Sequence, residues 1–463
     1  MESSDSPLSQ LDSLFNPRSI AVIGASDKTG RIGFVVVNSL VQGGFSGLIF
    51  PVNPRLTRLL DMPAFPSIEV IPDEVDLAII VLRKELVLKA MDECGRKGVR
   101  AVIVMSSGFS ELGEGKAEEE LVTKARHYGM RFLGPNCAGY AAPWESVYAS
   151  FENRVQQGNL GFISQSGAMC AVFLALARAE GLGLSMFVSY GNAADIGPDE
   201  LLKYLNKHEP SHLIACYLEG LIVRQARQFL LAARLVTPHK PILVLKPGNT
   251  RAGARAIASH TGTLAGEQAI YSGAFRQVGI LQANTLYEFI DACKTLTALP
   301  LPTGDRVAIM TNSGGPGVLT VDACAHVGLT VPQFDSTFMQ HLKKVLPPSC
   351  SVDNPVDVGP EGNEGTYQHI VQLLLANKNI DIVLVVCVPP AFSDIRAITK
   401  AVIAAKRTCT SKPLVTCWMA GDIVAESLPL LEKASIPNFP TPQRAATALS
   451  FLVQRARWLN SQP

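Results

Sequence analysis

Charged residues are scarce in this 463-residue chain, since Asp, Glu, Lys and Arg make up only 17% of it and the formal net charge is +1. No run of basic residues is long enough to follow a nucleic-acid backbone, so we expect no nucleic-acid partner. No apolar run reaches the roughly 18 residues of a membrane-spanning helix, and the serine-rich segment 1–10 lacks the apolar core of a secretory signal. We therefore expect no membrane association and a cytoplasmic location.

Paired cysteines are also lacking. The ten cysteines are scattered along the chain, form no C-x-x-C pair and have no histidine at metal-ligand spacing. Most of them lie in apolar surroundings, where a thiol is an ordinary small core residue. The sequence therefore predicts neither a disulfide framework nor a metal site on this chain.

Hydrophobic residues and glycines are abundant instead, at 47% of the chain and 37 residues respectively. This composition is typical of a compact protein with buried sheets, and the length suggests about three domains. Alternating strand and helix patterns predict an α/β fold with a doubly wound parallel sheet over residues 1–145. Two further α/β domains are expected over 155–295 and 303–463, each opening with a strand and a Ser-Gly turn.

A glycine-rich loop follows the first predicted strand, over residues 19–24, and precedes a helix over 34–41. Such a loop presents backbone N–H groups and a helix N-terminus to a phosphate. Ser26 stands where a dinucleotide fingerprint requires its second glycine, which favours a phosphorylated adenine nucleotide other than NAD. For the basic residues here, an ordinary solvated surface charge is the alternative. The predicted cofactor-binding residues, on this loop and on those after the next strands, are Gly24, Ala25, Ser26, Lys28, Arg31, Gly33, Pro51, Asn53, Arg83, Ser106, Ser107, Gly108 and Asn136.

A second anion site is predicted at the turn formed by Ser164, Gln165, Ser166 and Gly167. This turn lies between a strand over 160–163 and an alanine-rich helix over 168–180, so it again offers a helix N-terminus. Glu219 ends another predicted strand, and parallel strands bring their carboxyl ends to the same edge of a sheet. The alternative for Glu219 is a carboxylate merely exposed at a strand end.

His260 lies among small hydroxyl-bearing residues and glycines, in a stretch that we expect to form a loop over 259–266. A neutral imidazole is a good nucleophile toward phosphorus, and Thr261, Gly262 and Thr263 add phosphate donors. Glu219 could hold the second ring nitrogen and fix the tautomer. The chain thus has a candidate phosphohistidine, with a helix cap or a solvated turn as the alternative role for His260.

As a set, seven motifs resemble the alpha subunits of ADP-forming acetate–CoA ligases, within the succinyl-CoA synthetase superfamily. The resemblance spans essentially the whole chain. Its motifs are Ile20–Ser26, Phe50–Pro54, Gly134–Cys137, Ser164–Gly167, Ser259–Gly262, Thr311–Val318 and Asn354–Asp357.

The resemblance implies a Rossmann-like CoA-binding domain followed by two flavodoxin-like domains. It also implies an NDP-forming acyl-CoA synthetase that converts acyl-CoA, ADP and phosphate into carboxylic acid, CoA and ATP. The reaction would pass through an acyl phosphate and a phosphohistidine at His260, oriented by Glu219. No stretch resembles an ATP-grasp module, so a beta subunit carrying one would supply the ADP/ATP and Mg²⁺ sites in a hetero-oligomer.

Two other functions stay open at this point. A CoA- or acyl-CoA-sensing regulatory module could share this architecture without catalysis. An NAD-dependent dehydrogenase is disfavoured because Asn53 replaces the acidic residue expected at the end of the second strand. Arg83 and Lys84 depart from the Pro-Ala often found in the family, and the identity of the acid is open.

Overall fold

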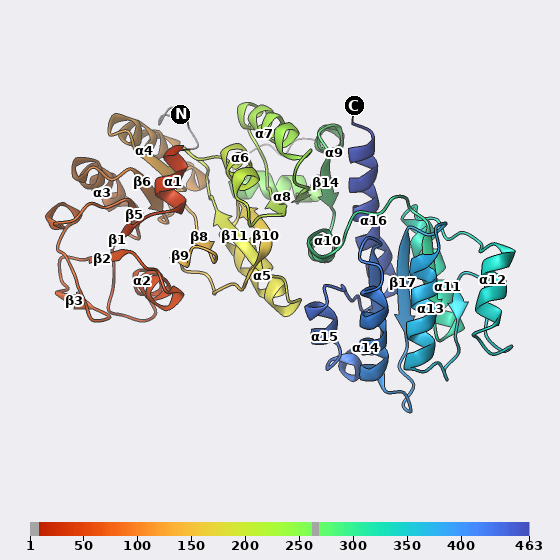
Figure 1. Cartoon of the computed structure of the whole chain (residues 1–463). Helices are drawn as coiled ribbons and strands as arrows, with labels where there is room; N and C mark the ends of the chain where they lie inside the picture. The colour runs from red at the N-terminus through yellow and green to blue at the C-terminus, as the bar shows by residue number, and fades with distance from the viewer. Residues whose placement is uncertain (1–8, 262–267, 463) are drawn as a thin grey trace, which may run out of the picture. The chain divides into compact units, whose positions relative to one another are not determined.

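The computed structural model describes residues 9–261 and 268–462 (Figure 1). It divides into two compact units, Met1–Asn284 and Thr285–Pro463. Among the described residues, no helix combines the length and the apolar character needed to cross a membrane. Eight of the ten cysteines are buried, and this burial raises the pKa of Cys137 and Cys170 to about 12.

The first sheet of unit 1 is parallel and has the order β2-β1-β5-β6-β7. Its central strands β1, β5 and β6 are rich in Ile, Val and Ala and are buried throughout, as expected for a sheet covered on both faces. The order reverses between β1 and β5, and this switch point is where ligands bind in doubly wound folds. The elements are α1 (Ser9–Phe15), β1 (Ser19–Ile23), α2 (Ile32–Gly43), β2 (Leu48–Val52), β3 (Arg58–Leu59), β4 (Met62–Pro63), η1 (Ile68–Val70), β5 (Leu77–Ile80), α3 (Lys84–Lys97), β6 (Ala101–Val104), η2 (Ser110–Leu112), α4 (Gly115–His127) and β7 (Arg131–Leu133).

The second sheet of unit 1 has seven strands in the order β14-β13-β12-β10-β11-β8-β9. The hairpin β8–β9 pairs antiparallel with β11, so residues from 139 onward belong to this sheet although the sequence placed 139–145 in the first domain. The elements are β8 (Gly139–Ala142), β9 (Val147–Ser150), β10 (Gln157–Ser164), α5 (Gly167–Ala179), β11 (Leu184–Ser189), α6 (Pro198–Lys207), β12 (Leu213–Tyr217), α7 (Val223–Val236), β13 (Ile242–Leu245), α8 (Arg251–Thr261), α9 (Gln268–Gln277) and β14 (Ile280–Ala283).

Unit 2 contains a four-stranded parallel sheet of order β16-β15-β17-β18. Its first helix, α10, is tied to α16 by Arg444, which donates to both oxygens of the buried Asp291 at 2.6 and 2.7 Å. The sequence had placed most of α10 in the middle domain, and the three domain limits remain a prediction. The elements are α10 (Leu286–Ala298), β15 (Val307–Thr311), α11 (Gly314–His326), α12 (Ser336–Lys343), β16 (Val356–Asp357), α13 (Glu364–Ala376), β17 (Ile382–Cys387), α14 (Ile395–Lys406), β18 (Leu414–Trp418), η3 (Gly421–Val424), α15 (Leu428–Lys433) and α16 (Pro442–Asn460).

The expected loop at His260 is wrong over residues 259–261, because α8 continues through Thr261. Alanine recurs at every second position from Ala252 to Ala258, and this strong helix former favours continuation of the helix through the small residues that follow. Gly262 and Thr263 lie outside the described residues, as do the side chains of His260 and Thr261.

Candidate active site

A cavity of about 1400 Å³ opens at the carboxyl ends of β1, β5 and β6, at the switch point of the first sheet. Two glycines make the chain's tight turn there possible. A Cβ on Gly24, whose φ is +94°, would lie 2.2 Å from the carbonyl oxygen of Val81, and one on Gly33 would lie 2.1 Å from that of Gly24. The β1–α2 turn therefore passes directly over the strand ends, where its backbone can approach a ligand closely.

Eleven of the thirteen predicted cofactor-binding residues line this cavity. Asn136 lines a neighbouring cavity instead, and Pro51 is a buried part of β2 whose carbonyl accepts a hydrogen bond from the Phe65 amide at 2.9 Å. The eleven are Gly24, Ala25, Ser26, Lys28, Arg31, Gly33, Asn53, Arg83, Ser106, Ser107 and Gly108.

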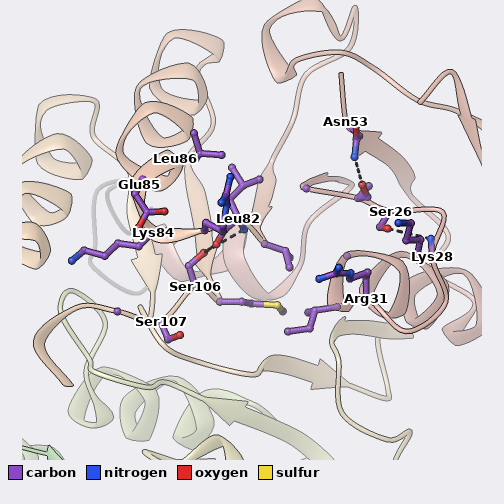
Figure 2. A pocket seen from close by; sticks show the side chains of 18 of the residues that line it. Ser26, Lys28, Arg31, Asn53, Leu82, Lys84, Glu85, Leu86, Ser106 and Ser107 are labelled. Carbon is purple, nitrogen blue, oxygen red and sulfur yellow. Dashed lines mark hydrogen bonds between the residues drawn. The ribbon is translucent and has the colours of Figure 1, made fainter. Parts of the chain in front are cut away.

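Basic side chains stand on opposite sides of the first cavity. Figure 2 shows Lys28 and Arg31 beside the β1–α2 turn and Lys84 across from them, at the start of α3. Lys84 is also 3.5 Å from Glu114 in an ion pair. Asn53 donates to the Ala25 carbonyl at 2.7 Å and so fixes the turn. The cavity can hold an extended ligand with several anionic groups.

A second cavity of about 480 Å³ adjoins the first, and Ile32, Met105 and Ser107 line both. Its other lining residues come from the segments that follow β6, β7, β9, β10, β11 and β12. They include three residues of the predicted phosphate turn and the predicted carboxylate, namely Gln165, Ser166, Gly167 and Glu219.

The turn before α5 is held by its own hydroxyl groups. Ser164 donates to the Ser166 carbonyl at 2.7 Å and accepts from the Ser166 amide at 3.2 Å. Ser166 caps α5 by accepting from the Met169 amide at 3.3 Å. Ser164 is fully buried beneath the turn, so its contribution is to shape the backbone that Ser166 and Gly167 present to the cavity.

Gln165 connects the turn to the segment that carries Glu219. Its side-chain oxygen accepts hydrogen bonds from the amides of Glu219 and Gly220, at 3.0 and 3.2 Å. Glu219 is thereby held at the edge of the second cavity, as the strand pattern predicted. The helix α8, which includes His260, lies beside η2, and Glu111 of η2 also lines this cavity.

Glu111 and Asn192 are among the lining residues of the second cavity that were not predicted as site residues. The side-chain amide of Asn192 donates a hydrogen bond to Glu111 Oε2 at 2.7 Å. Another unpredicted feature is Lys246, at the end of β13, whose fully buried ammonium lies 4.5 Å from the centre of the Tyr271 ring. Burial lowers the pKa of Lys246.

Three family models match successive parts of the chain. They describe a CoA binding domain over residues 18–143, a succinyl-CoA ligase like flavodoxin domain over 157–296 and a ligase-CoA domain over 307–462. The chain is 42% identical to the alpha subunit of acetate–CoA ligase [ADP-forming] II of Pyrococcus furiosus, over 96% of this chain and 98% of that one. The chain belongs to the family of ADP-forming acetate–CoA ligase alpha subunits.

Other members of this ligase family support the same assignment. Acetate–CoA ligase [ADP-forming] I of Archaeoglobus fulgidus is 38% identical over 96% of this chain, but the match covers only 63% of that longer protein. An acetyl-coenzyme A synthetase of Ca. Korarchaeum cryptofilum, solved in complex with phosphate and ADP, matches with a TM-score of 0.93 and 38% identity over 97% of both chains.

Membership in the ADP-forming ligase family confirms the resemblance read from the motifs. It also confirms the α/β fold with a CoA-binding domain followed by ligase domains. The chain is accordingly a subunit of an NDP-forming acyl-CoA synthetase, an acid–thiol ligase, and the first cavity lies within its CoA-binding domain.

Proposed function

We propose that this chain is the catalytic alpha subunit of the synthetase, and that it transfers phosphate from an acyl phosphate to His260. The observation that carries the proposal is the adjoining pair of cavities. The first cavity has the basic residues and the glycine turn of a site for an extended anionic ligand. The second cavity is lined by the N-terminus of α5 and by Glu219. The two cavities share Ile32, Met105 and Ser107 as a common wall.

Coenzyme A occupies the first cavity in this proposal. The glycine turn from Gly24 to Gly33 receives the diphosphate, and Lys28, Arg31 and Arg83 neutralise phosphate charge. The thiol end then points toward the shared wall, so that an acyl group on sulfur enters the second cavity.

Inorganic phosphate binds at the N-terminus of α5, against the backbone of Ser166 and Gly167. One of its oxygens attacks the thioester carbon, the carbon–sulfur bond breaks, and the electron pair leaves with the CoA thiolate. The product is an acyl phosphate that stays in the second cavity.

The imidazole of His260 then attacks the phosphorus of the acyl phosphate, and the carboxylate leaves with the electron pair of the broken P–O bond. Glu219 accepts a hydrogen bond from the other ring nitrogen, which fixes the tautomer and stabilises the positive charge on the ring. Thr261, Gly262 and Thr263 supply further phosphate contacts.

A beta subunit with an ATP-grasp domain takes the phosphoryl group to ADP and holds Mg²⁺, within a cytoplasmic hetero-oligomer. This part rests on two relatives. The Pyrococcus furiosus protein is an alpha subunit, and the Archaeoglobus fulgidus ligase has more than a third of its length beyond the match.

The test is an ATP assay with acyl-CoA, ADP, phosphate and Mg²⁺, run on this chain alone and with the chain that co-purifies from its native host. We expect ATP only when both chains are present. ATP made by this chain alone would contradict the division of labour. No ATP with any co-purifying partner would favour the CoA-sensing module instead.

A further inference from the structure

Asn192 lies in the loop after β11 and is the centre of a hydrogen-bond cluster beside the second cavity. Its side-chain amide lies 2.7 Å from Glu111 Oε2, 2.9 Å from Glu118 Oε2 and 3.1 Å from Ser110 Oγ. Its side-chain oxygen accepts a hydrogen bond from the side-chain amide of Asn136 at 3.3 Å. Since carboxylates only accept hydrogen bonds, the two glutamates require a donor at this position.

The backbone under Asn192 is tightly held. The backbone N–H of Asn192 donates to the Pro135 carbonyl at 3.0 Å. A Cβ on the preceding residue, Gly191, would lie 2.2 Å from that carbonyl oxygen and 2.4 Å from the carbonyl oxygen of Asn136. The loop after β11 is therefore packed directly on the loop after β7 and provides a fixed platform for the side chain.

Glu111, held by Asn192, in turn holds the backbone of segment 107–109 through hydrogen bonds. Its carboxylate accepts from the amide of Gly108 and from that of Phe109, the latter at 3.1 Å. Burial alone raises the pKa of the Glu111 carboxyl, but the hydrogen bonds from Asn192 and these amides lower it overall. The ionised carboxylate is therefore favoured, and this is the form that accepts hydrogen bonds from the amides of Gly108 and Phe109.

The segment that Glu111 holds forms part of the first cavity. Ser107 and Gly108 line that cavity, and Ser107 lines the second one too. Gly108 has φ of +105°, and a Cβ there would lie 3.1 Å from Lys84 Cδ, so this backbone packs on another lining residue. A shift of Glu111 would therefore change the shape of the cavity on the side of Lys84.

We propose that Asn192 is a positioning residue, which holds the Ser107–Gly108 wall of the first cavity in place through Glu111 and Glu118. Glu118 reaches the end of the same stretch because it accepts a hydrogen bond from Ser110 Oγ at 2.8 Å. The inference rests on the proposed function, because it takes coenzyme A as the ligand of the first cavity. Glu118 lines neither cavity, so any effect it has on CoA binding acts through this cluster.

The test measures the Kd for coenzyme A by calorimetry on the full chain. Asn192→Asp keeps the shape of the side chain but replaces the donor with a third carboxylate, so we expect Kd to rise about tenfold or more. Glu118→Gln alone should weaken binding by no more than about threefold, because the Gln oxygen still accepts. Combined with Asn192→Asp, Glu118→Gln should improve binding over N192D alone, since it removes one negative charge and supplies a donor.

This reversal of the sign of the Glu118→Gln effect is the decisive readout, because independent structural effects would add. The exposed Glu120→Gln on the same helix α4 is the control and should leave Kd unchanged in both backgrounds. If N192D does not fold, Asn192→Ser takes its place and tests the first expectation alone: CoA binding should weaken, and a Kd within twofold of wild type would overturn the inference.

Two results would overturn the inference: a Kd for N192D within twofold of wild type, or a Glu118→Gln effect of the same sign in both backgrounds. A wild-type chain that binds no coenzyme A would overturn the proposed function itself, and the inference with it. Thermal unfolding of each variant separates a loss of fold from a loss of affinity.

Discussion

Gly33 shows at the scale of one residue how backbone packing shapes the first cavity, in the CoA-binding domain. Its Cα hydrogen faces the carbonyl oxygen of Gly24, where a Cβ would be only 2.1 Å away. Gly30 belongs to the same loop, yet a Cβ there would meet no atom within 4 Å. The two glycines therefore differ in what they contribute. The sequence analysis selected Gly33 and not Gly30 as a site residue, but only the structure shows the close approach to Gly24 that separates them.

Gly33→Ala should push the start of α2 away from β1. We expect a loss of about 1–3 kcal/mol in unfolding free energy, as for other overpacked sites, and at least about tenfold weaker CoA binding. Denaturant unfolding and calorimetry measure the two effects. Gly30→Ala is the matched control and should change neither. Equal behaviour of the two variants would show that the close approach at Gly33 is unimportant.

At the scale of elements, most strands could be predicted from the sequence because they are short apolar runs that end at glycine or polar residues. The strand predicted over 19–24 agrees with β1 to within one residue, and the strand predicted over 160–163 lies within β10. The hairpin β8–β9 was missed because Gly139–Ala142 is a short run of small residues, and only its pairing with β11 makes it a strand.

The site residues that could be predicted are those marked by neighbouring sequence, at the end of a strand or the start of a helix. Gly24, Ser166 and Glu219 each follow a strand closely, and Gly33 lies where the glycine-rich loop gives way to a helix. The structure brings all four to the two cavities. The partner of Glu111 is 81 residues away in sequence, and such a contact depends on how two sheets pack.

A repeat noted in the sequence is also visible in the hydrogen bonds. Before α11, Thr311 donates to the Ser313 carbonyl at 2.9 Å and accepts from the Ser313 amide at 3.1 Å. Ser164 makes the same two bonds to Ser166 before α5. A hydroxyl at the end of a strand therefore shapes the turn in the same way in both units.

Asp381 anchors the start of β17 to the segment that leads into β15. It accepts from Thr303 Oγ1 at 2.8 Å and from the amide and Nε of Arg306 at 3.0 and 2.8 Å. Burial alone raises the pKa of its carboxyl, but the hydrogen bonds from Arg306 and Thr303 lower it overall. The ionised carboxylate therefore stabilises the folded chain.

Asp381→Asn should lower the unfolding free energy by about 1–3 kcal/mol at pH 7. Because the folded pKa lies below the unfolded value of about 3.9, the stabilisation is present above that value and is lost as the pH falls through the folded pKa. Denaturant unfolding from pH 7 to pH 3 measures the difference between wild type and variant. The exposed Asp353→Asn is the control, and a difference that stays constant with pH would contradict the account.

At the scale of the whole molecule, three ligase-family domains follow one another along the chain, and unit 1 alone contains both cavities. The proposed function therefore places thioester cleavage and phosphoryl capture on residues of unit 1. In the proposed function, transfer to ADP requires phosphorylated His260 to reach a nucleotide site on the partner. We therefore propose that His260 connects the two half-reactions.

Phosphorylation of His260 is the most direct test of this account. The chain is incubated with acyl-CoA and ³²P-labelled phosphate, without nucleotide, and the protein-bound label is located by peptide mapping. We predict a label that is labile in acid and stable in base, lies on the peptide containing His260, and is absent from His260→Ala. A label that survives His260→Ala, or a chain that folds and binds coenzyme A but takes up no label, would contradict the account.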